Sequence, residues 1–173
     1  MTAEILVLRG INVGGHGKLP MAGLRALLQG LGAGQVATYI QSGNAVYRGS
    51  LAPGAVADAI EAAHGFRPSV QTRCLEEWEA LVEAMPWPEV EDHKALHLFL
   101  MAGESPTGIE LLEAAKGPEE RLCRLDRAVW LHTPKYLSGS TIAERMERLL
   151  GVPATARNRR TVVRLRDMAR GLG

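Results

Sequence analysis

The sequence predicts an α+β fold: a tandem duplication of ferredoxin-like (split βαβ) units with antiparallel sheets, plus a linking helix and a C-terminal helix. Two observations predict this fold. Short apolar runs and amphipathic stretches follow in the order β-α-β-β-α-β along the first half of the chain, and the same order returns in the second half. The predicted parts are a first repeat at 1–74, a linking helix with an acidic Pro-rich linker at 75–94, and a second repeat with a basic C-terminal helix at 95–173.

The first repeat begins with a near-continuous apolar run, which is typical of a strand buried on both faces. Its four strands are predicted at 4–9, 35–40, 45–48 and 69–73. Its two helices each begin at a proline and end at a glycine, because proline suits the first helical turn and glycine suits the end of a helix. These helices are predicted at 20–32 and 53–65, with apolar residues at helical spacing.

The second repeat has its elements in the same order, with strands at 96–102, 121–125, 128–133 and 152–157. One helix is predicted to open at Ser105-Pro106. The next is predicted to open at Thr141, since Thr141 and Glu144 have capping-box spacing. The stretch 44–47 (NAVY) is similar to 127–130 (RAVW), which indicates that the third strands of the two repeats correspond. Two further helices are predicted outside the repeats, at 75–85 and 159–170.

The topology brings two loops of the first repeat together. In a split βαβ sheet the strand order is 4-1-3-2 and neighbouring strands are antiparallel, so the first strand ends at the edge where the third begins. The loop Gly10–Leu19 and the turn Gln41–Asn44 are therefore expected to meet there. The helix opened by Pro20 points its N-terminus at the same edge, where unpaired N–H groups and a partial positive charge favour an anion.

The loop Gly10–Leu19 is also longer than its counterpart. Nine residues separate Gly10 from Pro20, whereas two residues separate Gly103 from Pro106 in the second repeat, an excess of about seven. Loops longer than a fold requires are a favoured place for function, although they are also tolerated at low thermodynamic cost.

We expect a phosphorylated metabolite or nucleotide to bind at this edge. Glycines allow close approach of the backbone, basic side chains supply charge, and amides and hydroxyls supply hydrogen bonds. The candidate anion-binding residues are Arg9, Asn12, Gly14, Gly15, Gly17, Lys18, Gln41, Ser42 and Asn44. The loop is neither a P-loop nor a dinucleotide fingerprint, because the GxxxxGK[ST] and GxGxxG spacings are absent. The alternative is a structural loop that packs against the second repeat.

A nucleic-acid-binding module is a second hypothesis. The C-terminal region carries arginines that could contact phosphates together: Arg157, Arg159, Arg160, Arg164 and Arg166. The alternative is a surface helix that balances the acidic stretch 75–92. Few aromatic side chains are available for base stacking, since the chain has three Trp, three Tyr and two Phe.

An enzyme acting on phosphate esters is a third hypothesis, but the sequence shows no paired catalytic acid and base, so no catalytic residue is assigned. His93 and His97 are four residues apart without a third ligand, so neither a metal nor a cofactor is predicted. Cys74 and Cys123 are too few for a disulfide scaffold and are expected to be small buried apolar residues.

The overall composition fits a soluble globular protein. Twenty Lys and Arg residues against nineteen Asp and Glu give a net charge of +1, which signals neither nucleic acid nor membrane. No apolar run approaches the roughly 18 residues of a membrane span, and the N-terminus lacks the pattern of a secretory signal. A cytoplasmic location without a membrane partner is therefore expected.

Several motifs resemble a known family. These are Arg9–Gly15 (RGINVGG) with Lys18, Thr38–Asn44 (TYIQSGN), and Val152–Asn158 (VPATARN) with Thr161. Over essentially the whole chain the sequence resembles the bacterial family catalogued as domain of unknown function (DUF) 1697. The resemblance implies an α+β fold with duplicated ferredoxin-like halves and implies no activity.

The chain departs from this family's pattern in two places. The family usually carries an aromatic residue, typically Trp, after the Arg-Asn pair, where this chain has Arg159. It also usually carries a basic residue near the start of the helix after the second hairpin, where this chain has Ser138–Thr141 (SGST).

Overall fold

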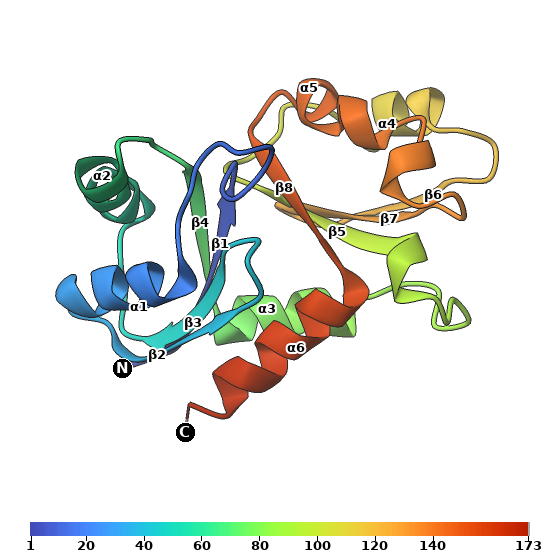
Figure 1. The fold of residues 1–173 in the computed structure, drawn as a ribbon. Helices are drawn as coiled ribbons and strands as arrows, with labels where there is room; N and C mark the ends of the chain where they lie inside the picture. The colour runs from blue at the N-terminus through green and yellow to red at the C-terminus, as the bar shows by residue number, and fades with distance from the viewer. Residues whose placement is uncertain (173) are drawn as a thin grey trace. The chain divides into compact units, whose positions relative to one another are not determined.

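The computed structural model describes residues 1–172 (Figure 1). The chain divides into two compact units: Met1–Ala80 together with the residues from Arg164 onward, and Leu81–Val163. The boundaries fall inside the helices α3 (Leu75–Glu83) and α6 (Arg159–Arg170). The sequence placed all of the C-terminal helix with the second repeat, whereas its second half belongs to the first unit.

The first unit contains a four-stranded antiparallel sheet of order β2-β3-β1-β4, as predicted. Its strands are β1 (Ala3–Arg9), β2 (Gly34–Tyr39), β3 (Asn44–Arg48) and β4 (Ser69–Cys74). The helices α1 (Met21–Gly30) and α2 (Pro53–His64) lie on one face of this sheet (Figure 1). Each helix lies within two residues of its predicted ends.

The core of the first unit lies between this sheet and the two helices. Leu6 and Leu8 of β1 pack there with Leu24 and Leu28 of α1 and Ile60 of α2. The alternate residues of β1 are buried as well, since Ile5 and Val7 are at most 2% exposed. Burial on both faces of β1 confirms the interpretation of its continuous apolar run.

The second unit repeats this arrangement, with strand order β6-β7-β5-β8. Its strands are β5 (Leu96–Met101), β6 (Arg121–Arg124), β7 (Ala128–His132) and β8 (Ala154–Asn158). One sheet face packs against α4 (Ile109–Ala115) and α5 (Met146–Leu150) through an apolar cluster that includes Phe99, Met101, Leu112, Met146 and Leu150. The tandem duplication of split βαβ units is therefore present in the structure.

Both helices of the second unit begin later than predicted. Ser105-Pro106 does not open α4, because the Ser105 hydroxyl donates to the Leu150 carbonyl at 2.5 Å and holds this stretch in a loop. Thr141 does not cap α5. Instead the Ser140 hydroxyl accepts hydrogen bonds from the N–H groups of Ile142 and Ala143, and a 3-10 turn, η3 (Ala143–Arg145), precedes the helix.

The similarity between NAVY and RAVW does not reflect equivalent positions. Tyr47 faces the helices of its unit, whereas the helix-facing residues of β7 are Val129 and Leu131, so Trp130 lies on the opposite face. The Trp130 indole donates there to the Leu81 carbonyl at 3.0 Å. A shift of one residue moves every side chain to the other face of a strand, so the matched letters are out of register.

The true repeat signature lies in the fourth strands. Arg73 on β4 faces Ile5, and Arg157 on β8 faces Leu98. Each arginine is buried, donates to the carbonyl of the preceding residue and also donates to the side chain two residues before it, which is Gln71 or Thr155. The matching stretches QTR and TAR share only the arginine, so sequence similarity alone does not reveal their correspondence.

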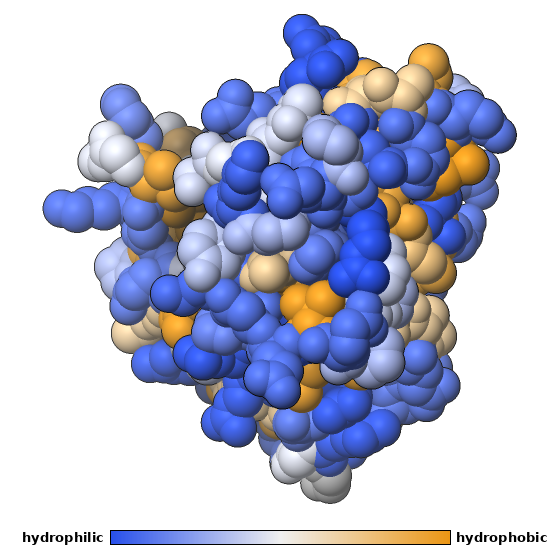
Figure 2. All heavy atoms as spheres, turned by 90° about the vertical axis from the view of Figure 1, so that its right-hand side faces the viewer, coloured by the Kyte–Doolittle hydropathy of each residue, from blue (hydrophilic) through white to orange (hydrophobic). Residues whose placement is uncertain are grey.

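The surface carries few large apolar side chains. Among the described residues, the exposed ones are Met1, Val13, Leu31, Ile40, Leu111 and Tyr136. On the face drawn in Figure 2, apolar residues form small groups separated by hydrophilic ones, so the described residues offer no broad apolar patch there. None of the helices within residues 1–172 combines the length and apolar character that a membrane crossing requires.

Candidate functional site

The glycine-rich loop of the first unit is a small β-hairpin. Val13 and His16 form an isolated antiparallel bridge, with N–H···O distances of 3.3 and 2.9 Å. Gly14 and Gly15 connect them with φ values of +58° and +77°. Positive φ at both central residues defines a type I′ turn, the connection that suits two-residue hairpins. The two glycines are therefore explained by turn geometry.

Asn12 clasps the base of this hairpin. Its side-chain amide donates to the carbonyls of Leu19 and Gln41 at 2.9 and 2.8 Å, and its Oδ1 accepts from the Leu19 N–H at 2.9 Å. These bonds join the hairpin to the turn Gln41–Asn44, so the predicted meeting of the two loops is confirmed. Both amide hydrogens of Asn12 are occupied by protein carbonyls, which makes Asn12 a residue that positions the loops.

The turn Gln41–Asn44 is packed tightly against the base of the loop. Gly43 has φ +85°, its carbonyl accepts from the Leu8 N–H at 2.8 Å, and a Cβ there would lie 2.6 Å from Cδ1 of Ile11. Asn44 is fully buried, and its amide donates to the Tyr39 carbonyl and the Ser42 hydroxyl, both at 3.0 Å. Asn44 thus closes the turn, while Gln41 and Ser42 are exposed.

The part of the chain that forms this edge carries basic side chains and no acidic ones. Between Glu4 and Asp58 the chain has no Asp or Glu, and its basic residues there are Arg9, Lys18, Arg25 and Arg48. Arg25 donates to the Thr38 hydroxyl and Arg48 to two backbone carbonyls. Arg9 and Lys18 are exposed at the loop. The N-terminus of α1 has no side-chain cap and no acidic residue in its first turn. An anion would therefore meet no carboxylate from this stretch of chain.

The excess length of the loop is smaller than the sequence indicated. Because α4 begins only at Ile109, seven residues (102–108) link β5 to α4, compared with eleven (10–20) between β1 and α1. The excess is thus four residues, and these are the two-residue turn and the Val13–His16 bridge of the hairpin.

The arginines of the alternative hypothesis do not form one exposed row. Arg157 lies on β8 and not on the helix; burial lowers the pKa of its guanidinium to about 10. Arg159 donates to the carbonyls of Val90 and Glu91, and Arg166 pairs with Asp167 at 2.8 Å. Of the five, Arg160 and Arg164 are exposed. The expectation that Arg157 joins the helical arginines is wrong, because β8 runs through Asn158.

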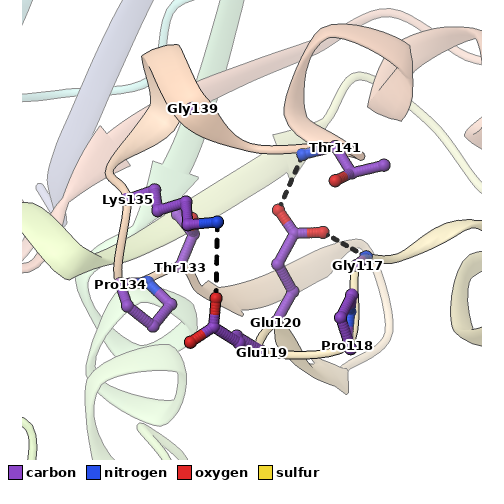
Figure 3. Close-up of a pocket in the computed structure, with 9 residues that line it drawn as sticks. All are labelled: Gly117, Pro118, Glu119, Glu120, Thr133, Pro134, Lys135, Gly139 and Thr141. Atoms are coloured by element: carbon purple, nitrogen blue, oxygen red, sulfur yellow. Dashed lines mark hydrogen bonds and ion pairs between the residues drawn. The ribbon is translucent and has the colours of Figure 1, made fainter.

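The second unit contains a pocket of about 70 Å³ beside the buried Glu120 (Figure 3). One carboxylate oxygen of Glu120 accepts from the Gly117 N–H at 2.6 Å, and the other accepts from the Ser140 hydroxyl and from the Thr141 N–H at 2.9 Å. Lys135 and Glu119 form an ion pair of 3.4 Å at its rim. Glu120 thus ties two loops together, and its hydrogen bonds fix the walls of the pocket.

The remaining sequence candidates occupy ordinary structural environments. His97 is buried on β5, and His93 starts the 3-10 turn η1 (His93–Ala95). Within the described chain, no three His, Cys, Asp or Glu side chains gather as metal ligands. Cys74 and Cys123 are half-buried rather than fully buried, because both lie on outer strands of their sheets.

The fold and the clasped hairpin define a class: an α+β protein with two split βαβ sheets and a hairpin inserted after its first strand. The sequence model described as "Protein of unknown function (DUF1697)" matches residues 1–130, and the chain belongs to this family. No match was found among curated proteins.

A solved structure supports the same fold. The chain is similar to the conserved bacterial protein SP0830 from Streptococcus pneumoniae, with 27% sequence identity and a TM-score of 0.72. The match covers 97% of this chain and 98% of that one, so the similarity extends over both units.

Proposed function

We propose that this protein binds a phosphorylated metabolite or a nucleotide at the edge formed by the hairpin Gly10–Leu19 and the turn Gln41–Asn44. The observation that carries the proposal is an exposed edge to which the chain between Glu4 and Asp58 contributes no carboxylate. Asn12 and Gly43 hold the two loops together, and the chain between Glu4 and Asp58 contributes only basic charge. A phosphate monoester is the kind of anion that such an edge favours.

The residues divide into two roles. Asn12, Gly17, Gly43 and Asn44 shape the edge, since their hydrogen bonds or close contacts lie within the protein. Lys18 and Gln41 are exposed and supply charge and hydrogen bonds for a ligand, and the exposed Arg9 and Ser42, which also interact within the protein, add to them at the same edge. The N–H groups of Gly14 and Gly15 add backbone donors at the tip. Successive αL residues differ from the alternating conformations of a P-loop nest, so side chains carry most of the recognition.

A thermal-shift series tests this proposal. The probes are inorganic phosphate, sugar phosphates and nucleoside mono- and triphosphates. A ligand present at about 100 times its Kd stabilises the folded state by about 2.7 kcal/mol, a shift that is easily measured. Lys18→Gln should weaken binding about tenfold or more, because it removes a charge-assisted hydrogen bond of roughly 1.5–3 kcal/mol. Lys94→Gln, at an exposed lysine of the second unit, is the matched control.

Two outcomes would overturn the proposal. One is the absence of any shift across the probes, and the other is binding that Lys18→Gln and Lys94→Gln weaken equally. Single-stranded and duplex oligonucleotides distinguish a nucleic acid from a small phosphate ester, because their binding falls steeply with salt. Turnover of a phosphate ester that Lys18→Gln abolishes and Lys94→Gln preserves would identify the same edge as catalytic.

A further inference from the structure

The acidic linker of the second unit is docked onto its sheet. Trp87, half-buried with φ +58°, lies beside His132 with ring centroids 6.0 Å apart, and the Arg121 guanidinium lies 4.8 Å from the Trp87 ring centroid. Arg121 also pairs with Glu89 at 2.8 Å. We call residues 86–92 the acidic strap, because three of their side chains are Glu89, Glu91 and Asp92.

Further contacts hold the other end of the strap. Arg159 donates to the carbonyls of Val90 and Glu91, and the Tyr136 hydroxyl donates to Asp92 at 2.9 Å. A guanidinium nitrogen of Arg160 lies 3.3 Å from Nδ1 of His93, the residue that follows the strap. Arginine side chains thus hold the strap along its length.

The position of the Arg121 side chain depends on the protonation state of His132. His132 lies directly opposite Arg121 in the β6–β7 pair, and Nδ1 of His132 accepts a hydrogen bond from Nε–H of Arg121 at 3.2 Å. Arg121 has no acceptor atom, so Nδ1 of His132 must be unprotonated in this state. A proton taken from solvent onto Nδ1 would remove the acceptor and place an imidazolium against the guanidinium.

We propose that residues 86–92 form a pH-sensitive strap, which stays docked on β6 and β7 while His132 is neutral and releases when this imidazole takes up a proton. The charged groups facing His132 are Arg121 on β6 and Glu89 on the strap. Loss of the Arg121–His132 bond disturbs the same guanidinium that stacks on Trp87 and pairs with Glu89, so release is concerted.

The pKa shifts of His132, Glu89 and Asp92 support the proposed pH-sensitive strap. Burial and Arg121 lower the pKa of His132, and Glu89 of the strap raises it by less, so the docked state as a whole disfavours the proton. Hydrogen bonding to Arg121 lowers the pKa of the Glu89 carboxyl, and hydrogen bonds from Lys94 and Tyr136 lower that of Asp92. Both carboxylates therefore stay ionised under mildly acidic conditions, where a histidine titrates.

Hydrogen exchange of the strap tests the proposal on the full-length protein. Mass spectrometry follows residues 86–92 between about pH 7.5 and pH 5, with the intrinsic pH dependence of exchange removed. Release coupled to the uptake of one proton raises the opening constant by up to about tenfold per pH unit. His132→Asn keeps an acceptor near the Nδ1 position and cannot be protonated. The number of protons taken up when the strap opens should therefore be smaller by one than in the wild-type protein. His64→Asn, at an exposed histidine of α2, is the matched control.

Two results would overturn the proposal: exchange of the wild-type strap that does not change with pH, or a His132→Asn protein with the wild-type pH dependence. Arg121→Lys provides a second test that does not alter the histidine. It keeps a positive charge but loses the planar stack on Trp87 and the Nε–H bond, so the strap should exchange rapidly at both pH values. Wild-type protection in Arg121→Lys would equally contradict the proposal.

Discussion

Single side chains hold the hairpin Gly10–Leu19 against the turn Gln41–Asn44, and Asn12 is the clearest case. Its φ of +52° is one that asparagine tolerates better than most residues, and its amide donates to two carbonyls in different parts of the chain. The sequence singled out Asn12 as a ligand-binding residue. The structure gives its amide a positioning role instead, because both donors are used within the protein.

Asn12→Asp should destabilise the protein by about 1–3 kcal/mol, because it removes both donors while retaining the oxygen that accepts from Leu19. Urea denaturation measures this loss. Asn158→Asp is the matched control, since Asn158 uses only Oδ1 to accept from the Thr161 N–H, and aspartate caps a helix equally well. Equal stability changes in the two variants would contradict the role of the Asn12 amide in holding the two loops together.

His97 should make the folded state sensitive to acid. Burial lowers its pKa to about 4, and its Nδ1 has no hydrogen-bond partner within residues 1–172. An unfolded histidine has a pKa of about 6.5. Between about pH 6.5 and pH 4 the unfolded state therefore binds a proton that the folded state does not, and the free energy of unfolding decreases as the pH is lowered. The free energy of unfolding should drop by up to about 3 kcal/mol between pH 6.5 and pH 4.

Chemical denaturation at several pH values measures this dependence. His97→Leu should flatten the curve below about pH 6.5, since it removes the proton acceptor. The same change at exposed His64 serves as the control. An unchanged slope in His97→Leu would show that other groups cause the loss of stability.

At the scale of elements, the junction between the first loop and the turn after β2 requires glycine. Gly43→Ala would place a Cβ 2.8 Å from the Leu8 Cβ and 2.6 Å from Cδ1 of Ile11, in a backbone conformation of φ +85°. We expect a loss of about 2–4 kcal/mol from the combined strain and overpacking. Gly54→Ala on α2 meets no atom within 4 Å and should be neutral or stabilising by about 0.4–1 kcal/mol. Thermal denaturation of both variants checks this contrast.

Most elements could be predicted because their signals are local. Pro53 and Gly65 mark the ends of α2, and Gly65 adopts the left-handed cap conformation expected of it. The failures occurred where a distant partner decided the outcome. Ser105 bonds to Leu150, and Ser140 bonds to Glu120, so neither α4 nor α5 begins where its sequence signal lies.

At the scale of the whole molecule, the C-terminal segment is part of the first unit. Leu165 and Ala169 are at most 2% exposed, Arg170 pairs with Glu79 at 2.5 Å, and Arg48 donates to the Leu172 carbonyl at 2.8 Å. The first unit is therefore discontinuous in sequence, which no local pattern could reveal.

Leu165→Ala should reduce the free energy of unfolding by about 2–5 kcal/mol, as expected for a large-to-small change at a buried site. Hydrogen exchange should accelerate in β1–β4 as well as in α6, because these belong to the same unit. Arg164→Ala, at the exposed neighbouring position, should change stability by no more than about 0.5 kcal/mol. Exchange that accelerates only in β5–β8 would contradict the assignment of the segment.

The sequence by itself determined the duplicated element order, the strand order of each sheet and the meeting of the hairpin with the turn Gln41–Asn44. The element order follows from hydrophobic periodicity, which is a local property of the sequence. The strand order and the meeting of the loops follow from that element order, because a split βαβ unit has one antiparallel topology. Only the tertiary structure decided that Arg157 is buried, that Asn12 is a clasp and that the acidic linker is docked by Arg121 and Arg159. Each of these depends on burial or on a partner far away in the chain, and a long polar side chain has many such partners available until the backbone is folded.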